Sequence, residues 1–247
     1  MQSHSAYDSL AADYDVIIDW PSRLAREGPF IERLVERIGA RTVLDVGGGT
    51  GHHARMLHEW GLEVTIADPS LATLDAVRGD LPPDIRLEPV GFDGLAPLGR
   101  FDLVVCLGNT IPHVAGLEEF RAALGALYGA VGPGGALLVH QINYEPILAD
   151  FDRERFMPAR GATGKFLLRF FEKAGERLRF VIMRVTGEAG EYQTEFMATY
   201  HTVIGAGDYR EALVALGAPE PELLGGWGRA RFVPEESDVL IVAVRRP

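Results

Sequence analysis

The chain is short of cysteine, of basic residues and of long apolar runs, and each shortage excludes a class of protein. Its 247 residues include one cysteine, Cys106, so no internal disulfide can form and a reducing compartment, the cytoplasm, is expected. The formal net charge of −11 disfavours DNA or RNA as a partner, because phosphate contacts dominate nucleic-acid affinity. No apolar run reaches the roughly 18 residues of a membrane span, and no basic-then-apolar leader opens the chain, so we expect neither an anchor nor a signal peptide. A small-molecule partner is therefore expected.

From Arg41 onward, short β-rich runs alternate with amphipathic helical stretches. Continuous apolar strands separated by such helices predict a doubly wound, mostly parallel sheet that is covered on both faces. We expect strands at 42–47, 63–68, 85–89, 101–108 and 135–143, and helices at 51–61, 70–81 and 116–131.

The third quarter of the chain breaks this alternation. The segments 165–173, 176–187 and 191–204 are predicted as three antiparallel strands, because no crossover helix separates them. We therefore expect an insertion over the edge of the main sheet, followed by a helix at 207–217 and a return of the chain at 222–226 and 237–245.

We expect one Rossmann-like α/β domain over residues 1–247, with a seven-stranded sheet. Residues 1–40 are predicted to form a helical cap, because 21–39 places Leu24, Phe30, Leu34 and Ile38 near one face of a helix. The remaining parts are a cofactor-binding core over 41–148, an antiparallel lid over 149–205, and a last helix with the final strands over 206–247. A homo-oligomer is left open.

The first predicted strand runs into the glycine-rich turn VLDVGGGTG, residues 43–51. Glycine tolerates positive φ, and its missing Cβ lets a ligand approach the backbone. The next strand ends in Asp68, where a doubly wound fold places an acid for ribose hydroxyls. This order of strand, glycine turn, helix, strand and acid favours a nucleoside-containing cofactor over a turn that binds nothing.

The spacing Gly47-x-Gly49-x-Gly51 is one residue shorter than the fingerprint that binds a dinucleotide pyrophosphate. Asp45 lies within the strand, and a carboxylate there opposes a pyrophosphate but suits a ligand that carries an ammonium group. S-adenosylmethionine (SAM) carries an ammonium and a sulfonium, so these residues favour SAM. A nicotinamide-dependent oxidoreductase is the alternative, and it lacks a Tyr-x-x-x-Lys pair downstream.

VLDVGGGTG followed by Asp68 resembles the SAM-binding signature of class I methyltransferases. FDLVVCLGNTIPHV, residues 101–114, resembles the fourth-strand segment of the glycine and sarcosine N-methyltransferase-like group. The likeness extends to an N-terminal segment with Tyr14, Trp20 and Arg23 and to the tail from residue 225. The resemblance implies methyl transfer from SAM, with S-adenosylhomocysteine (SAH) as product, to a small molecule, most simply at an amine nitrogen. A hydroxyl acceptor and a SAM-binding module without catalysis remain the alternatives.

The resemblance also implies roles for single residues. Gly47 and Gly49 would lie against the methionyl part of SAM, Asp68 would accept the ribose hydroxyls, Asp93 would contact the adenine, and Arg23 would meet the SAM carboxylate. The full set implied for the cofactor is Tyr14, Trp20, Arg23, Asp45, Gly47, Gly49, Gly51, Asp68, Pro69, Phe92, Asp93, Leu107, Gly108 and Asn109. The set implied for catalysis is His113, Tyr14 and Asn109.

The histidines are weighed one by one. His113 follows the fourth strand at the carboxyl edge, where such folds bind ligands, and a site role is favoured over a loop role. His140 and Gln141 suit a cavity or a structural hydrogen bond equally. His52 and His53 point about 100° apart on a helix and lack further ligands, so no metal site is predicted and both are interpreted as bystanders.

Strand alternation puts Tyr200 and His201 on opposite faces of the last inserted strand. The same alternation places Tyr192, Phe196 and Tyr200 together on one face, which is interpreted as a packing face. Cys106, among apolar strand residues, is interpreted as an inert buried side chain.

Overall fold

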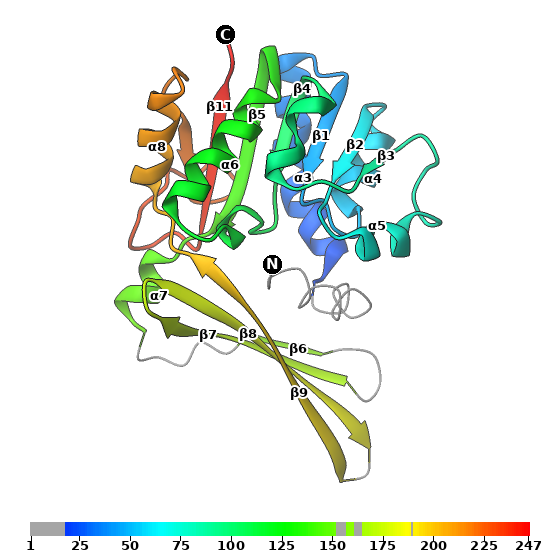
Figure 1. Cartoon of the computed structure of the whole chain (residues 1–247), viewed down its shortest axis with the longest axis vertical. Helices are drawn as coiled ribbons and strands as arrows, with labels where there is room; N and C mark the ends of the chain where they lie inside the picture. Colours follow the sequence, from blue (N-terminus) through cyan, green and yellow to red (C-terminus); the bar gives the residue numbers. More distant parts are fainter. Residues whose placement is uncertain (1–17, 152–156, 161–164, 189) are drawn as a thin grey trace.

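The computed structural model describes residues 18–151, 157–160, 165–188 and 190–247, which form two separate β-sheets (Figure 1). The elements in chain order are α3 (Trp20–Ile38), β1 (Thr42–Val46), α4 (His52–Glu59), β2 (Glu63–Ala67), α5 (Leu71–Val77), β3 (Arg86–Glu88), η1 (Phe92–Gly94), η2 (Ala96–Leu98), β4 (Phe101–Cys106), η3 (Ile111–His113), α6 (Leu117–Gly129), β5 (Val131–Ile142), α7 (Glu145–Ala149), β6 (Met157–Arg160), β7 (Lys165–Ala174), β8 (Arg177–Glu188), β9 (Glu191–Thr202), α8 (Ala206–Ala215), β10 (Glu222–Leu224) and β11 (Val239–Arg245).

The main sheet has seven strands within the described part of the chain, in the order β10-β11-β5-β4-β1-β2-β3. The five strands from β1 to β5 pair in parallel, whereas β11 pairs antiparallel with both β5 and β10. The predicted α/β fold with a mostly parallel sheet is confirmed. The carboxyl ends of β1, β2 and β4 therefore meet along one edge, and that edge holds the site described below.

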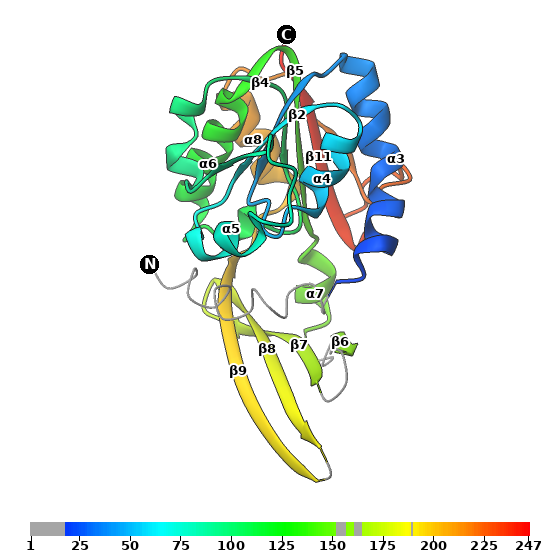
Figure 2. The same cartoon turned by 90° about the vertical axis from the view of Figure 1, so that its right-hand side faces the viewer.

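Helices cover both faces of the main sheet, which explains why its strands are apolar at successive positions. In Figure 2, α6 and α8 lie on one side of the sheet and α3 and α4 on the other. Leu44 of β1 packs with Phe120 of α6 and Leu213 of α8, whereas the neighbouring Val43 packs with Leu34 of α3 on the opposite face. One strand thus contributes side chains to two cores, as strand alternation requires.

Helix α3 carries the N-terminal side of the site. Asp19 caps it by accepting a hydrogen bond from the Ser22 amide at 3.2 Å, and Gly39 ends it in a left-handed conformation. Phe30 and Leu34 are buried against the sheet, as the amphipathic pattern predicts. Within the described ranges, no helix combines the length and the apolarity that crossing a bilayer requires.

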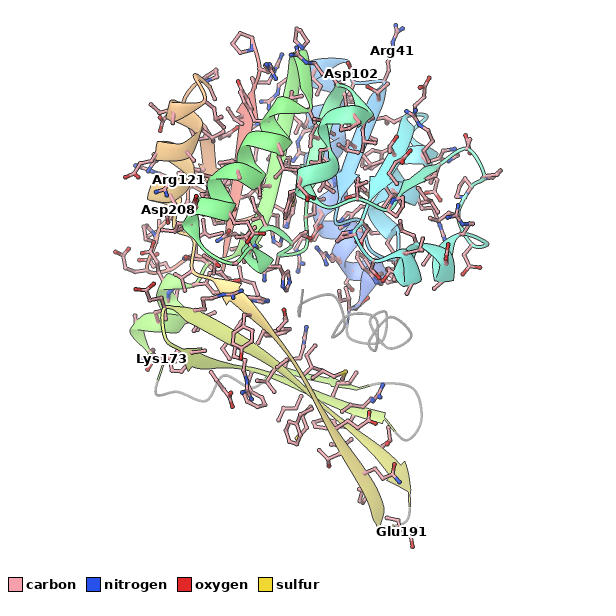
Figure 3. The ribbon with its side chains drawn as sticks, viewed as in Figure 1. Arg41, Asp102, Arg121, Lys173, Glu191 and Asp208 are labelled. Carbon is pink, nitrogen blue, oxygen red and sulfur yellow. The ribbon has the colours of Figure 1, made fainter. Side chains whose placement is uncertain are left out.

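The second sheet, β6–β9, forms an antiparallel arm that extends away from the main sheet (Figures 1 and 2). Glu191 marks its tip, and Lys173 lies near the end that meets the body (Figure 3). The sequence predicts three antiparallel strands here, and the structure adds a fourth, β6. This strand is only four residues long, and it is recognisable by its pairing with β7 rather than by any pattern of its own.

The aromatic stripe on β9 corrects one interpretation. Tyr192, Phe196 and Tyr200 share a face as predicted, but their exposed fractions are 65%, 66% and 39%. Only Tyr200 is partly covered among the described residues, by the Arg177 guanidinium at 5.2 Å from its ring centroid. The opposite face of β9, which carries Thr199 and His201, is the one that packs against the body. Strand alternation indicated the two faces correctly, but it could not indicate which face the body covers.

Two element boundaries differ from the prediction by four residues. Helix α5 ends at Val77 rather than at residue 81, and beyond it the Asp80 amide bonds to the Val77 carbonyl three residues back, as in a tighter turn. Strand β5 begins at Val131, four residues early, because Val131 already pairs with Phe101 before an irregularity in the ladder.

Candidate active site

A cavity of about 510 Å³ opens at the carboxyl edge of the main sheet. Its wall comes from the start of α3, the glycine turn after β1, the end of β2, the segment after β3, and the loop after β4 with η3. Parallel strands direct these loops to one edge, so segments far apart in sequence share one wall. The volume lies within the range of pockets for drug-sized ligands.

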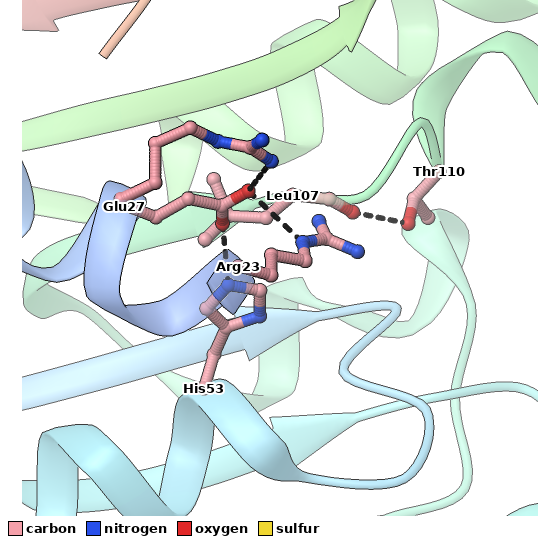
Figure 4. Close-up of polar contacts among 6 residues, drawn as sticks. Arg23, Glu27, His53, Leu107 and Thr110 are labelled. Atoms are coloured by element: carbon pink, nitrogen blue, oxygen red, sulfur yellow. Dashed lines mark hydrogen bonds and ion pairs between the residues drawn. The ribbon is translucent and has the colours of Figure 1, made fainter. Parts of the chain in front are cut away.

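The glycine turn lies close to the loop after β4, and this contact explains Gly47. Gly47 has φ of 70°, and a Cβ there would lie 2.2 Å from Cγ2 of Thr110. The Thr110 hydroxyl in turn donates to the Leu107 carbonyl at 2.8 Å (Figure 4). Gly49 lies on the cavity wall, and no atom lies within 4 Å of the Cβ position there. The turn thus presents bare backbone to the cavity.

Asp68, at the end of β2, holds the same turn. Its Oδ2 accepts a hydrogen bond from the Gly49 amide at 3.1 Å, and its Oδ1 accepts one from the Ser70 amide at 2.9 Å. Asp68 also lines the cavity, so its carboxylate holds the turn at the point where a ligand would meet it.

A buried ion network lies beside the turn (Figure 4). The Glu27 side chain is fully buried; Arg23 donates Nε–H to its Oε1 at 2.9 Å, and His53 Nε2 lies 2.7 Å from its Oε2. Burial would raise the pKa of Glu27, but the hydrogen bond to His53 and the charge of Arg23 outweigh burial and lower the pKa from 4.5 to about 2. Glu27 is thus an anion that fixes both of its neighbours.

Two polar atoms on this part of the wall lack partners among the described residues. Arg23 Nη2 and Asp45 Oδ2 are both buried without a hydrogen bond. Burial raises the pKa of Asp45, His53 and Arg23 oppose the rise, the charge of Asp68 adds to it, and the net pKa is about 6 instead of 3.8. A buried donor and a buried acceptor without partners indicate that a ligand supplies the missing groups.

His113 of η3, at the end of the loop that follows β4, contacts strand β9 of the arm. Its Nδ1 lies 3.2 Å from the Thr199 hydroxyl of β9, and its ring stands edge-to-face against the His201 ring with 4.6 Å between centroids. His113 also lines the cavity and is half-buried. A titratable ring at a cavity wall, held by a hydroxyl, is suited to orienting a ligand and accepting a proton.

The comparisons with known proteins agree with this geometry. Residues 43–135 match the family model described as "Methyltransferase domain". A S-adenosylmethionine-dependent methyltransferase from Clostridium acetobutylicum ATCC 824 superposes with a TM-score of 0.79 at 14% identity over 97% of this chain and 98% of that one. Residues 43–135 therefore match a methyltransferase domain, and the chain as a whole shares the fold of that solved structure.

Two further proteins are similar to this chain. The glycine/sarcosine N-methyltransferase of Halorhodospira halochloris is 34% identical over 149 residues, which are 57% of this chain and 54% of that protein. SAM-bound CalS10, an amino pentose methyltransferase from Micromonospora echinaspora, has a TM-score of 0.75 at 21% identity, with 96% and 95% of the two chains covered. The chain spans about half the length of the curated relatives that it matches.

The residues around the unpaired atoms fit SAM as a cofactor. The amino-acid end of SAM carries a carboxylate, which could accept a hydrogen bond from Arg23 Nη2, and an ammonium, which could donate one to Asp45 Oδ2. The glycine turn gives access to the backbone nearby, and Asp68 offers acceptors to hydroxyl groups.

Most of the predicted site residues lie on this one cavity. The predicted residues that line it are Trp20, Arg23, Asp45, Gly47, Gly49, Asp68, Pro69, Phe92, Asp93, Leu107, Gly108, Asn109 and His113. Gly51 does not line the cavity; it begins α4 and packs against Leu81. Tyr14 lies outside the described residues. Contact of each residue with the cofactor or the acceptor stays a prediction.

The structure distinguishes a cavity role from a structural role for Gln141 and His140. Gln141 is structural: its Nε2 donates to the Ile204 carbonyl at 2.8 Å, and its Oε1 accepts from the Tyr209 hydroxyl at 2.7 Å. His140 stacks on Trp227, away from the cavity wall, and burial lowers its pKa to about 4. Cys106 is fully buried as predicted, and burial raises the pKa of its thiol.

His53 and Glu27 are the residues that sequence reasoning missed. His53 was interpreted as a bystander, yet it lines the cavity, whereas the neighbouring His52 stacks on Trp20 with 4.3 Å between ring centroids. Glu27 follows Arg23 by four residues on a helix, a spacing at which opposite charges pair, and this was the available signal. The described residues hold no cluster of three metal-ligating side chains.

Proposed function

We propose that this protein transfers the methyl group of SAM to the amine nitrogen of a small molecule. One observation carries the proposal: Arg23 Nη2 and Asp45 Oδ2 are buried on the wall of one cavity, opposite in charge, and neither has a hydrogen-bond partner among the described residues. An amino-acid end offers a carboxylate to the first atom and an ammonium to the second. A pyrophosphate-containing cofactor would instead bring negative charge towards Asp45.

The names of the relatives support an amine as acceptor. The curated relative acts by its name on glycine and sarcosine nitrogen, and CalS10 by its title on an amino pentose. The acidic chain, with a net charge of −11, gives no general attraction to nucleic-acid phosphates. A small amine is therefore the acceptor class that the relatives and the charge favour together.

The chain's own residues orient the reactants and manage a proton. SAM, when bound, supplies a methyl group on a positively charged sulfonium. A nucleophile in line with the C–S bond can bond to the methyl carbon while the sulfur leaves with the electron pair. Arg23 and Asp45 are assigned to the amino-acid end and Asp68 to the ribose hydroxyls. A neutral amine attacks with its lone pair and needs no strong base, but it must release a proton once the new bond has formed. His113 is assigned to orient the acceptor and take that proton.

A hydroxyl acceptor is the second candidate, and His113 is the observation that favours it. A phenol or carboxyl group relies on a base, and a histidine on the cavity wall is suited to that task near neutral pH. The two candidates differ in the atom that gains the methyl group.

The test combines binding and turnover. Thermal unfolding is measured with SAM, SAH and NAD, and the protein is then incubated with methyl-labelled SAM and, separately, glycine, sarcosine, an amino sugar and a simple phenol. We expect stabilisation by SAM and SAH, and label on the nitrogen of at least one amine. Label on the phenol alone would assign an O-methyltransferase. Binding of SAM with no transfer to any acceptor would support a binding module, and stabilisation by NAD alone would overturn the cofactor assignment.

A further inference from the structure

The loop after β4, residues 107–114, is held at its far end by the base of the arm. The Thr202 hydroxyl of β9 donates to the Val114 carbonyl at 2.6 Å, and Arg177 Nη2 of β8 donates to the same oxygen at 3.3 Å. Thr199 lies 3.2 Å from His113 Nδ1. Two strands of the inserted sheet therefore contact a loop that lines the cavity.

The near end of the same loop is held by a buried polar cluster. Asn109 adopts φ of 70°, a left-handed conformation that is uncommon for residues other than glycine. Its Oδ1 accepts the Ile142 amide at 2.9 Å, which fixes the orientation of the side-chain amide. Its Nδ2 therefore points as a donor to His201 Nδ1 at 3.4 Å. The Tyr144 hydroxyl completes the cluster, 3.0 Å from His201 Nδ1 and 3.1 Å from Asn109 Oδ1.

His201 is the residue that both ends share. Its side chain is 1% exposed, and its ring stacks on Phe180 while standing edge-to-face against His113. Burial lowers the pKa of His201 well below the usual value, and the neighbouring charges of His113 and Arg177 lower it further, so the ring is neutral. Nδ1 faces the amide donor of Asn109, so we assign the single ring proton to Nε2, which is buried without a hydrogen bond to the described residues.

We propose that His201 of the arm is a positioning residue that fixes the loop 107–114, through the side chain of Asn109 on one side and the ring of His113 on the other. His201 does not line the cavity, so it acts through these two residues. The inserted sheet is then part of the active-site scaffold rather than only a cover. This inference rests on the proposed methyltransferase function for its kinetic and SAH-binding tests and is independent of that function for its nitrogen-shift test.

The test compares three variants with one matched control. His201→Phe keeps a buried ring but removes the Nδ1 acceptor, and His201→Asn restores an acceptor near the position of Nδ1. Tyr144→Phe removes the hydroxyl alone and covers the case in which His201→Phe does not fold. The control is Tyr209→Phe, which removes an equally buried hydroxyl whose partner is Gln141, outside the cavity wall.

Two readouts are needed. SAH affinity is measured by calorimetry, and kcat and KM are measured with whichever amine the acceptor panel identifies. We expect His201→Phe to lower kcat about tenfold, the size of one lost buried hydrogen bond, and to weaken SAH binding by a smaller factor. His201→Asn should recover most of both losses, Tyr144→Phe should fall between, and Tyr209→Phe should keep wild-type SAH affinity and kcat.

A third readout needs no turnover. In protein labelled with ¹⁵N at histidine, the Nδ1 of His201 should show the shift of an unprotonated nitrogen and the Nε2 that of a protonated one. The proposal is overturned if His201→Phe keeps wild-type SAH affinity and kcat, if His201→Asn is as impaired as His201→Phe, or if Nδ1 carries the proton. If no amine is methylated, the proposed function fails, while the nitrogen shifts still decide the role of His201.

Discussion

Replacing Asp45 with Asn should make the ligand-free protein more stable at alkaline pH while weakening its hold on SAH. Asp45 lies on β1 with 2% of its surface exposed, and its Oδ2 has no partner among the described residues. Burial first, and then the charge of Asp68, raise the pKa of this carboxyl from 3.8 to about 6. The folded chain without a ligand therefore ionises Asp45 at a cost that the unfolded chain does not have.

The sign and the size of this stability difference follow from the difference in the pKa of Asp45 between the folded and the unfolded chain. The pKa of Asp45 is higher in the folded chain than in the unfolded chain, so protonation favours folding. This stabilisation is complete below the unfolded pKa, near 4, and is lost as the pH rises through the folded pKa, about 6. A difference of about two pKa units corresponds to about 3 kcal/mol at pH 8, taken as an upper value because the site can relax. The Asn variant lacks the charge and should be more stable than wild type at pH 8 by about 1–3 kcal/mol, with the two converging near pH 4.

The assay is chemical unfolding of both proteins at pH 4 and pH 8, without and with SAH. Asp102→Asn is the matched control, because Asp102 lies at the end of the sheet away from the arm (Figure 3) and accepts the Arg41 and Thr42 amides at 2.8 and 2.9 Å. Burial raises the pKa of Asp102, but these hydrogen bonds outweigh burial and lower the pKa. Replacing Asp102 with Asn should therefore destabilise the fold at pH 8 and leave SAH affinity unchanged. An Asp45→Asn variant that is no more stable at pH 8, or that binds SAH like wild type, would refute the reasoning.

Three further changes probe the same cavity. Asp68→Ala should weaken SAH binding by about ten- to a hundredfold in calorimetry, because hydrogen bonds to a charged acceptor are lost and the Gly49 amide loses its partner; unchanged affinity would remove Asp68 from the cofactor site. Glu27→Gln should destabilise the fold by about 3–5 kcal/mol at pH 7 in chemical unfolding, since Arg23 and His53 lose a buried anion. The difference should shrink as the pH falls from about 4.5 towards the folded pKa near 2, and a difference that stays constant over that range would count against the ion network. His113→Ala should lower kcat more than SAH affinity, and the reverse pattern would assign His113 to the cofactor.

The sequence predicts well those parts of the site that come from elements next to one another along the chain. The glycine turn and Asp68 are nineteen residues apart, yet a strand, a turn, a helix and a second strand leave little choice about where they meet. The hydrogen bond from the Gly49 amide to Asp68 is the direct result. The same logic brings Asn109 and His113 to the cavity, because both follow β4 at the carboxyl edge of the sheet.

The parts that the sequence does not predict depend on pairings between distant segments. Glu27 and His53 lie on different helices, and a charged residue on an amphipathic helix ordinarily faces water, so the pattern of α3 gives no sign that Glu27 is buried. The contact between Asn109 and His201 spans 92 residues and depends on how the arm docks. Strand alternation identifies the face on which His201 lies, but only docking decides which face of the arm meets the body.

The loop after β4 joins two ends of the cavity that are stabilised in different ways. At Gly108, with φ of 76°, a Cβ would lie 3.3 Å from Arg23 Nη2, so the loop passes against the charged end formed by the ion network. Five residues later, His113 rests on Thr199 and His201 of the arm. Between these two contacts Asn109 bonds to the Ile142 amide and to His201, so the loop connects the charged end with the arm. An insertion of this kind can reshape the space in front of His113 and still leave the residues at the charged end in place, since none of Arg23, Glu27 and His53 belongs to the arm.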